Sequence, residues 1–298
     1  MNVPSNPDPD VIRITHAIQQ RGYKAYLVGG YLRDLVMDRK SRDVDFAVGG
    51  DAPALAAVVA EETNGHSFLI DRKRGVARVV FGSDNYLDTA DFANMQGASI
   101  EEDLGKRDFS VDAMAVDAGL KQDIIDPHGG LEDIGEKRIR AVSDRVMADD
   151  PVRLVRAFRL AVVLGFTISD ETLAMIGRDA HFISSTPGER IRNELVSILK
   201  ESHSAPALQK MADVRLLKYI FPGFKNVRDL KNLESSVTNK NRFGEILEYG
   251  INRLVILKMA VLLGDADKET AVAAADRLRL SRKSKRALLA AKKYLDIL

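Results

Sequence analysis

Apolar residues are spaced in two different ways along the chain, and the change falls near residue 142. Before it, short apolar or alternating runs, which are typical of β-strands, separate segments in which apolar residues recur every three or four positions. After it, only the helical spacing remains. The pattern predicts an α+β N-terminal half followed by an all-helical C-terminal half.

The expected elements follow from this reading. Strands are expected at 23–30, 43–49, 66–71, 75–82 and 85–92, with a final hairpin at 113–117 and 123–127. Helices are expected at 31–37, 52–63 and 100–106, and then at 150–165, 170–178, 187–201, 204–214, 227–233, 243–264, 268–278 and 282–296.

Capping residues mark the ends of two of the N-terminal helices. Asp51 can accept a hydrogen bond from the first turn of helix 52–63, and Asn64 with the following glycine ends that helix. Ser99 and Glu102 form a capping box for the short helix at 100–106.

Composition narrows the class of protein. A chain of 298 residues is long enough for about two domains. The absence of cysteine excludes disulfide frameworks, thiolate metal sites and cysteine nucleophiles. The net charge of +1 argues against a protein whose whole surface is basic and binds nucleic acid, but it allows a local basic face. The acidic, proline-rich start is unlike a signal peptide, and no apolar run is long enough for a bilayer, so we expect a cytoplasmic protein without membrane contact.

Asp43 and Asp45 are the first chemical signal. At positions i and i+2 of a strand, their side chains share one face. Two carboxylates on one face repel each other unless a cation lies between them, and such hard oxygen ligands suit Mg²⁺ together with substrate phosphate. Asp88, on strand 86–92, can complete a triad; Asp91 is the competing choice, but it points to the opposite face of that strand from Asp88.

A glycine pair precedes these carboxylates. Gly29 and Gly30 lie at a strand-to-helix junction, where backbone N–H groups can approach a phosphate and the helix N-terminus favours an anion. Arg33, in the first turn of that helix, can bind the same phosphate. The order strand, Gly-Gly, helix, Asp-x-Asp strand is therefore a more specific signal of a site for phosphate and metal than any one of these features alone.

Asp150 and Arg153 are the most informative pair of the helical half. At i and i+3 they share a helix face, and Arg156 and Arg159 continue the stripe. Cytosine and adenine each present an amine donor beside a ring-nitrogen acceptor, which a carboxylate and a guanidinium can read. Uracil and guanine present a carbonyl in place of the amine, which repels the carboxylate. The alternative is an ordinary intrahelical salt bridge.

Five segments in order resemble one family. VGGYLRDLVMDRKSRDVDFAV, LDTADF, EEDLGKRDFSVDAMAVD, DDPVRLVRAFRLAVVLGF and GERIRNELVSIL are similar to motifs of the class II tRNA nucleotidyltransferases and bacterial poly(A) polymerases, and they lie within residues 23–200. The resemblance implies a nucleotidyltransferase head of the DNA polymerase beta-like superfamily (a mixed sheet with flanking helices) at 1–142, a helical neck that reads the base at 143–200, and a helical, tRNA-binding body at 201–298.

The resemblance also implies roles for individual residues. Asp43, Asp45 and Asp88 are expected to be the catalytic carboxylates and to hold two Mg²⁺ ions. The residues expected to bind the nucleotide are Gly29, Gly30, Arg33, Arg107, Asp150, Arg153, Arg156 and Arg159. The expected activity is template-independent addition of CMP and/or AMP, from CTP and ATP, to the 3′ end of tRNA, with release of pyrophosphate.

The sequence departs from the family pattern at Pro151, Asp112 and Asp149. Pro151 makes Asp150 an expected N-cap, so its carboxylate can bond backbone N–H groups as well as a base. Asp112 replaces the usual Asn and adds a negative charge that a metal or an arginine must offset. The departures concern nucleotide reading and leave the reaction class unchanged.

RNA contact is expected from the basic segment 277–294, through Arg282, Lys283, Lys285 and Arg286, to the acceptor and T arms of tRNA. The alternative is a solvated terminal helix. The sequence shows no aromatic stacking platform, which favours recognition of tRNA by shape. No protein partner is evident.

Several activities stay open. Addition of CCA, CC alone or A alone, and poly(A) synthesis, all fit the motifs, although the Arg-rich segment of the poly(A) branch is missing. Outside the enzyme class, the alternative is a non-catalytic RNA-binding relative that has kept the fold.

Overall fold

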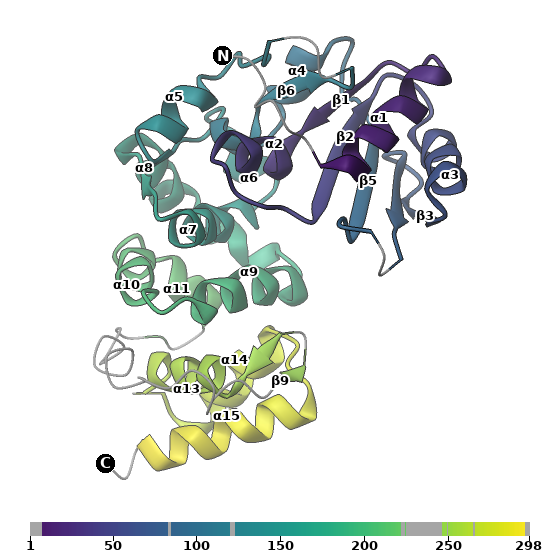
Figure 1. The fold of residues 1–298 in the computed structure, drawn as a ribbon. Helices are drawn as coiled ribbons and strands as arrows, with labels where there is room; N and C mark the ends of the chain where they lie inside the picture. Colours follow the sequence, from purple (N-terminus) through teal and green to yellow (C-terminus); the bar gives the residue numbers. More distant parts are fainter. Residues whose placement is uncertain are drawn as a thin grey trace. The chain divides into compact units, whose positions relative to one another are not determined.

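The computed structural model describes residues 8–82, 85–119, 123–221, 224, 246–248, 250–264 and 266–295. The chain divides into two compact units. The first contains residues up to 136 together with 140–143, and the second contains 137–139 and 144–298. Each unit is described by itself below (Figure 1).

The first unit is built on a six-stranded mixed sheet with the order β3-β4-β5-β2-β1-β6. The strands are β1 (Ala25–Val28), β2 (Asp43–Val48), β3 (His66–Asp71), β4 (Val76–Val80), β5 (Thr89–Asn94) and β6 (Ala115–Asp117). Only β2 and β5 are parallel neighbours; the other pairs are antiparallel. The expected final hairpin is reduced to β6 and a bridge between Ala115 and Ile125.

The helices of the first unit are α1 (Pro9–Gln20), α2 (Gly29–Val36), α3 (Ala52–Thr63), α4 (Ile100–Leu104) and α5 (Gly130–Gly135), with a 3₁₀ turn η1 (Ser110–Asp112). The Asp51 carboxylate accepts a hydrogen bond from the Ala54 N–H, and Asn64 ends α3 in the left-handed conformation. Ser99 caps α4 by accepting from the Glu102 N–H. The caps at Asp51, Asn64 and Ser99 are confirmed, but the capping box is not formed as expected, because Glu102 Oε2 accepts from the Ala98 N–H.

One face of the sheet forms the main hydrophobic core with α1 and α3. Phe46 of β2 and Phe92 of β5 are buried there and stack at 5.2 Å between ring centroids. Because side chains alternate along a strand, Asp45, between Val44 and Phe46, points to the opposite face. A smaller cluster, which includes Ala47, Ile100 and Leu104, covers part of that opposite face. The core thus fixes which side of β2 carries the paired carboxylates.

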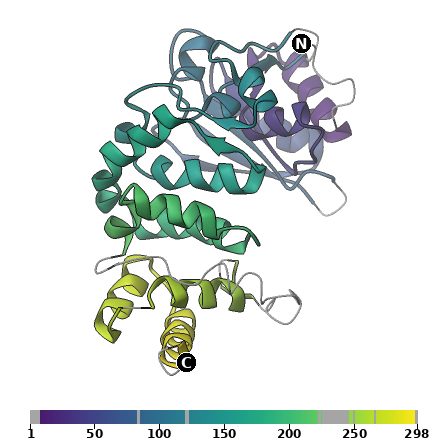
Figure 2. The same ribbon diagram turned by 90° about the vertical axis from the view of Figure 1, so that its left-hand side faces the viewer.

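The second unit is mainly helical. Its helices are α6 (Val146–Asp149), α7 (Arg153–Leu164), α8 (Asp170–Asp179), η2 (Ala180–Ser185), α9 (Gly188–Lys200), α10 (Ala205–Asp213), α11 (Leu216–Ile220), α13 (Arg253–Leu262), α14 (Lys268–Arg277) and α15 (Arg282–Leu295). Helix α7 packs on α9, and α13 packs on α9 and α15 (Figure 2).

The expectation of an all-helical second half is wrong in one respect. Two short strand pairs occur there, β7 (Arg138–Ile139) with β8 (Thr167–Ile168) and β9 (Ile246–Glu248) with β10 (Ile251–Asn252). The expected helix at 227–233 lies outside the described residues. No helix in the described ranges is long and apolar enough to cross a membrane.

Candidate functional site

The paired carboxylates lie at the start of β2. Asp43 is exposed, and its Oδ1 accepts a hydrogen bond of 2.7 Å from the Thr89 hydroxyl of β5. Asp45, two residues further along β2, is half-buried. Both point away from the aromatic core, as the alternation of the strand predicts.

Asp45 lies in a strongly perturbed environment. Burial raises its pKa to about 6; the Arg107 charge opposes this rise, and the Asp91, Asp112 and Asp43 carboxylates add to it. The positive charge of Arg107 thus does not fully compensate for the burial of Asp45 and for the neighbouring carboxylates. The site therefore gains from a cation that approaches Asp45.

The third carboxylate beside Asp45 is Asp91, and the expected assignment of Asp88 to this face is wrong in the structure. In the parallel pair of β2 and β5, Asp45 is the register partner of Asp91 and Asp43 of Thr89. Asp88 precedes β5, and its carboxylate forms an ion pair of 2.7 Å with Arg42. The sequence fixes the separation of Asp88 and Asp91, but only the register decides which of them shares the face of Asp45.

Arg78 of β4 holds Asp91 in place. The Arg78 Nε and Nη2 donate to the two Asp91 carboxylate oxygens at 2.6 and 2.7 Å. Sequence analysis missed this arginine, although its signal was present: Arg78 alternates with the buried Ala77 and Val79. The bidentate bond fixes the Asp91 side chain on the carboxylate face.

The glycine pair lies directly against Asp45. Gly29 has a φ of 72°, and a Cβ placed on it would lie 3.0 Å from Asp45 Oδ2 and 3.4 Å from Arg107 Nη1. A side chain at this position would meet both charged groups. Arg107 is itself oriented by Asp103, at 3.2 and 3.3 Å. The structure thus gathers Gly29, Asp45 and Arg107 at the first turn of α2.

Arg33 is held by two carboxylates. Its guanidinium donates to Asp112 at 2.5 Å and to Asp34 at 2.9 and 3.0 Å. Burial alone would lower the pKa of Arg33, but Asp112 and Asp34 raise it overall. Arg33 therefore offsets the extra negative charge that Asp112 brings. A Cβ on Gly30 would lie 3.3 Å from Arg33 Nη2, so Gly30 also makes room for this guanidinium.

In the second unit, Asp150 lies between α6 and α7. Both terminal nitrogens of Arg190, from α9, donate to its carboxylate at 2.9 and 2.7 Å. Burial alone would raise the pKa of Asp150, but the Arg190 hydrogen bonds and charge, Arg153 and a backbone hydrogen bond from Val152 lower it overall. The expectation that Asp150 is the N-cap is wrong, because α7 begins at Arg153 with Val152 at its N-cap. The Asp150 carboxylate does bond a backbone N–H, that of Val152, as expected.

The arginine stripe of α7 has partners of its own. The Arg153 Nη1 donates to the Val146 carbonyl at 3.2 Å. Glu194 of α9 accepts from Arg156 Nε at 3.0 Å and from Arg159 Nε at 2.5 Å. Sequence analysis did not identify Arg190 or Glu194 as partners, because both lie more than 30 residues from the side chains that they contact.

The basic residues expected to contact RNA lie on α15. Arg282, Lys283 and Arg286 are exposed, whereas Lys285 forms hydrogen bonds of 2.7 and 2.8 Å with the Asp276 carboxylate. Three cations of this group thus face solvent.

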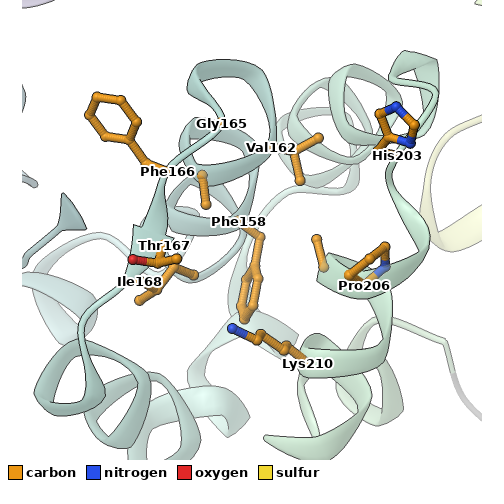
Figure 3. Close-up of a pocket in the computed structure, with 11 residues that line it drawn as sticks. Phe158, Val162, Gly165, Phe166, Thr167, Ile168, His203, Pro206 and Lys210 are labelled. Carbon is orange, nitrogen blue, oxygen red and sulfur yellow. The ribbon is translucent and has the colours of Figure 1, made fainter. Parts of the chain in front are cut away.

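The second unit also contains a cavity of about 360 Å³, which is lined by none of the charged residues discussed above (Figure 3). Its lining is mostly apolar, with Phe158 of α7 and Pro206 of α10 facing it and the Lys210 side chain extending across it. None of its lining residues is a carboxylate, and His203 is among them.

Two family models match the chain. The poly A polymerase head domain matches residues 25–140, and a model described as a probable RNA and SrmB-binding site of polymerase A matches residues 165–227. Together they cover most of the first unit and part of the second.

Curated relatives carry related names. The chain is 35% identical, over 90% of its length, to a CC-adding tRNA nucleotidyltransferase of Geobacter sulfurreducens. It is 32% identical to an A-adding tRNA nucleotidyltransferase of Aquifex aeolicus over 68% of its length. It spans 65% of the first relative and 26% of the second.

Solved structures share the fold. A Thermotoga maritima CCA-adding enzyme complexed with tRNA_CCA superimposes with a TM-score of 0.80 and 25% identity over 97% of this chain and 71% of that chain. A CCA-adding enzyme in complex with CTP superimposes with a TM-score of 0.80 and 26% identity, over 96% of this chain and 71% of that chain.

Proposed function

The chain belongs to the family of class II tRNA nucleotidyltransferases and bacterial poly(A) polymerases, and on this premise we propose that it transfers CMP or AMP from CTP or ATP to the 3′-hydroxyl of tRNA without a nucleic-acid template. One observation carries the proposal: Asp43 and Asp45 share one face of β2, with Gly29 directly against the Asp45 carboxylate. A non-catalytic RNA-binding relative has no use for this arrangement.

The donor set fits a divalent cation, and we propose Mg²⁺. Within the described residues no three His, Cys, Asp or Glu side chains form a ready-made metal site. Mg²⁺ suits such a place, since it usually binds through one or two carboxylates together with substrate phosphates. Asp43 and Asp45 would hold it, with Asp91 as the nearest third carboxylate. Bound there, two such ions would activate the 3′-hydroxyl and stabilise the departing pyrophosphate.

The protein groups around the carboxylates suit a triphosphate. Gly29 and Gly30 let the phosphates approach the first N–H groups of α2, where an anion is favoured. Arg107 supplies positive charge beside Asp45. The Arg33 guanidinium already donates hydrogen bonds to Asp112 and Asp34. Its role in triphosphate binding is therefore to neutralise the Asp112 charge and to make the start of α2 rigid.

Choice of the base falls to Asp150 and Arg153. The Asp150 carboxylate accepts from an exocyclic amine and Arg153 donates to the adjacent ring nitrogen, which selects cytosine and adenine. Arg190 holds the Asp150 carboxylate ionised and fixed, as a template must be. Arg156 and Arg159 extend the positive surface of α7, and Arg282, Lys283 and Arg286 contact tRNA phosphates.

The experiment uses purified protein with Mg²⁺ and three tRNA transcripts that end at the discriminator base, after one added C and after two. Each is incubated with labelled CTP, ATP or UTP, and product lengths are read on a gel. Addition of C or A without UTP incorporation supports the proposal, and absence of any incorporation overturns it. The 35%-identical relative is named as CC-adding, so a stop after CC is the first product pattern to examine; long A tails would instead indicate poly(A) synthesis.

A further inference from the structure

Strand β3 lies at the edge of the sheet (Figure 1), and it carries exposed apolar side chains. Phe68 is 49% exposed and Leu69 44% exposed, on neighbouring positions of this strand. About half of the Phe68 surface is in contact with solvent. It is therefore available for a ligand.

The strand register places Phe68 on the face of the candidate site. Phe68 is the partner of Arg78, and Arg78 is the partner of Asp91. Asp91 is in turn the partner of Asp45. Partners on adjacent strands share a face, so one row runs across the sheet from Phe68 to Asp45. Leu69, the partner of Ala77, points to the other face.

Three strand spacings of about 4.8 Å separate Phe68 from Asp45, a distance of about 14 Å. This is too far for the reacting 3′ nucleotide. It is within reach of the nucleotides that precede it in the same strand.

Basic side chains follow Phe68 on the same hairpin, four to six residues further along the chain. Arg72, Lys73 and Arg74 form the turn between β3 and β4, and all three are exposed. An exposed aromatic side chain and exposed cations on one hairpin are the kinds of groups that hold single-stranded nucleic acid, in which bases stack and phosphates pair with positive charge.

We propose that Phe68 is a stacking platform for a base of the RNA strand just upstream of the 3′-hydroxyl, with the 72–74 turn contacting its phosphates. The proposal rests on the proposed function, because it takes the Asp45 end of the row as the place of reaction. It goes beyond that function by giving the first unit a role in holding the primer strand, where the sequence showed no aromatic platform.

An edge strand can also pair with a second copy of the chain. Two observations favour RNA. The row of Phe68 leads directly to the carboxylates, and the adjoining turn is positively charged, as a phosphate backbone requires and as a second copy of the same basic turn does not.

The test is steady-state extension of a tRNA transcript by Phe68→Ala, Phe68→Leu and Phe68→Tyr. Because stacking of one base changes binding roughly 5- to 150-fold, we expect the Ala and Leu variants to raise the KM for RNA at least about fivefold, with kcat at saturating RNA and the KM for CTP unchanged. Phe68→Tyr should keep the wild-type KM. Leu69→Ala, on the opposite face of the same strand, is the matched control and should also keep it.

A second measurement separates this proposal from the proposed function. A fluorescent single-stranded RNA ending in ACC is titrated with each protein, and anisotropy gives its Kd without turnover. Weaker binding by Phe68→Ala and Phe68→Leu alone supports the platform even if the wild type incorporates no nucleotide. An unchanged Kd and KM in Phe68→Ala overturns the platform, as does a dimer in sedimentation that this variant converts to monomer.

Discussion

Arg190 donates both terminal nitrogens of its guanidinium to the carboxylate of Asp150, at 2.9 and 2.7 Å. The two residues are forty positions apart. This bidentate bond ties the start of α9 to the turn that precedes α7 and fixes the plane of the carboxylate. A carboxylate fixed in this way can accept from one amine in one direction, which is what recognition of a base requires.

Asp150→Ala is expected to relax the choice of nucleotide. Loss of the acceptor removes the repulsion of a uracil carbonyl, and a specific pair of base contacts is worth about 1–3 kcal/mol of discrimination. The ratio of kcat/KM for CTP to that for UTP should therefore fall at least about fivefold. Arg190→Ala, which leaves Asp150 unfixed, should lower the same ratio by a smaller factor.

The control for these variants is Arg178→Ala, since Arg178 forms a similar pair with its neighbour Asp179. It should leave the ratio unchanged. An unaltered CTP preference in Asp150→Ala would refute the reading of the base by this carboxylate.

Asp43→Ala is expected to abolish nucleotide incorporation. Asp43 is exposed at the start of β2 and its Oδ1 is bonded only to the Thr89 hydroxyl, so the change costs little stability. Loss of a metal-holding carboxylate removes several kcal/mol of transition-state stabilisation, about a thousandfold or more in kcat. Binding of tRNA in a filter assay should remain near the wild-type value; wild-type kcat in this variant contradicts the metal assignment.

Asp45→Asn should stabilise the metal-free protein in a pH-dependent way. The folded-state pKa of Asp45 is about 6, above the ordinary 3.8, so the folded state binds this proton more tightly than the unfolded state. Its contribution to stability is complete below about pH 4 and is lost as the pH rises through 6. The variant should therefore exceed the wild type by on the order of 1–3 kcal/mol at pH 8 and match it at pH 4.

Thermal or urea unfolding in EDTA at both pH values measures this difference. Addition of Mg²⁺ at pH 8 should raise the melting temperature of the wild type more than that of the variant, because binding to the folded state stabilises it. Equal stability of the two proteins across the whole pH range would show that Asp45 is not under electrostatic strain.

Asp91→Asn is expected to impair catalysis more than Asp88→Asn. Asp91 is the register partner of Asp45, whereas Asp88 lies before β5 with its carboxylate on Arg42. The measurement is kcat for C addition as a function of Mg²⁺ concentration, in which Asp91→Asn should need more metal for half-maximal rate. A larger loss in Asp88→Asn would restore Asp88 as the third carboxylate.

Local signals in the sequence were sufficient for much of the fold. The capping Asp51 and the left-handed Asn64 directly flank the helix that they delimit, so a few neighbouring residues determine them. The shared face of Asp43 and Asp45 also follows from strand alternation alone.

Long-range pairing was not available from the sequence. The choice between Asp88 and Asp91 depends on the register of β5 against β2, where one residue of slip exchanges the two faces. Placing Phe68 on the carboxylate face requires three successive registers. The partners Arg190 and Glu194 depend on how α9 packs on α7. In each case the missing information is a contact between distant segments.

Glu194→Gln tests the last of these contacts. The Glu194 side chain is 11% exposed and its two oxygens accept from Arg156 and Arg159 of α7. Gln keeps one carboxamide oxygen as an acceptor and replaces the other oxygen with an amide NH2 group. That NH2 group is a donor, so it cannot accept a hydrogen bond from the arginine that it faces. Leaving a charged donor unsatisfied in a mostly buried place costs about 1–3 kcal/mol, so the midpoint of urea unfolding should fall.

Glu189→Gln is the matched control on the same helix. Its carboxylate is 52% exposed and lies 3.8 Å from Arg279, and an exposed pair of this kind contributes about 0–1 kcal/mol. Because Glu194 also orients the two arginines, Glu194→Gln should raise the KM for CTP and ATP together without altering the preference between CTP and UTP. A lower stability with unchanged nucleotide KM would limit Arg156 and Arg159 to holding α7 against α9.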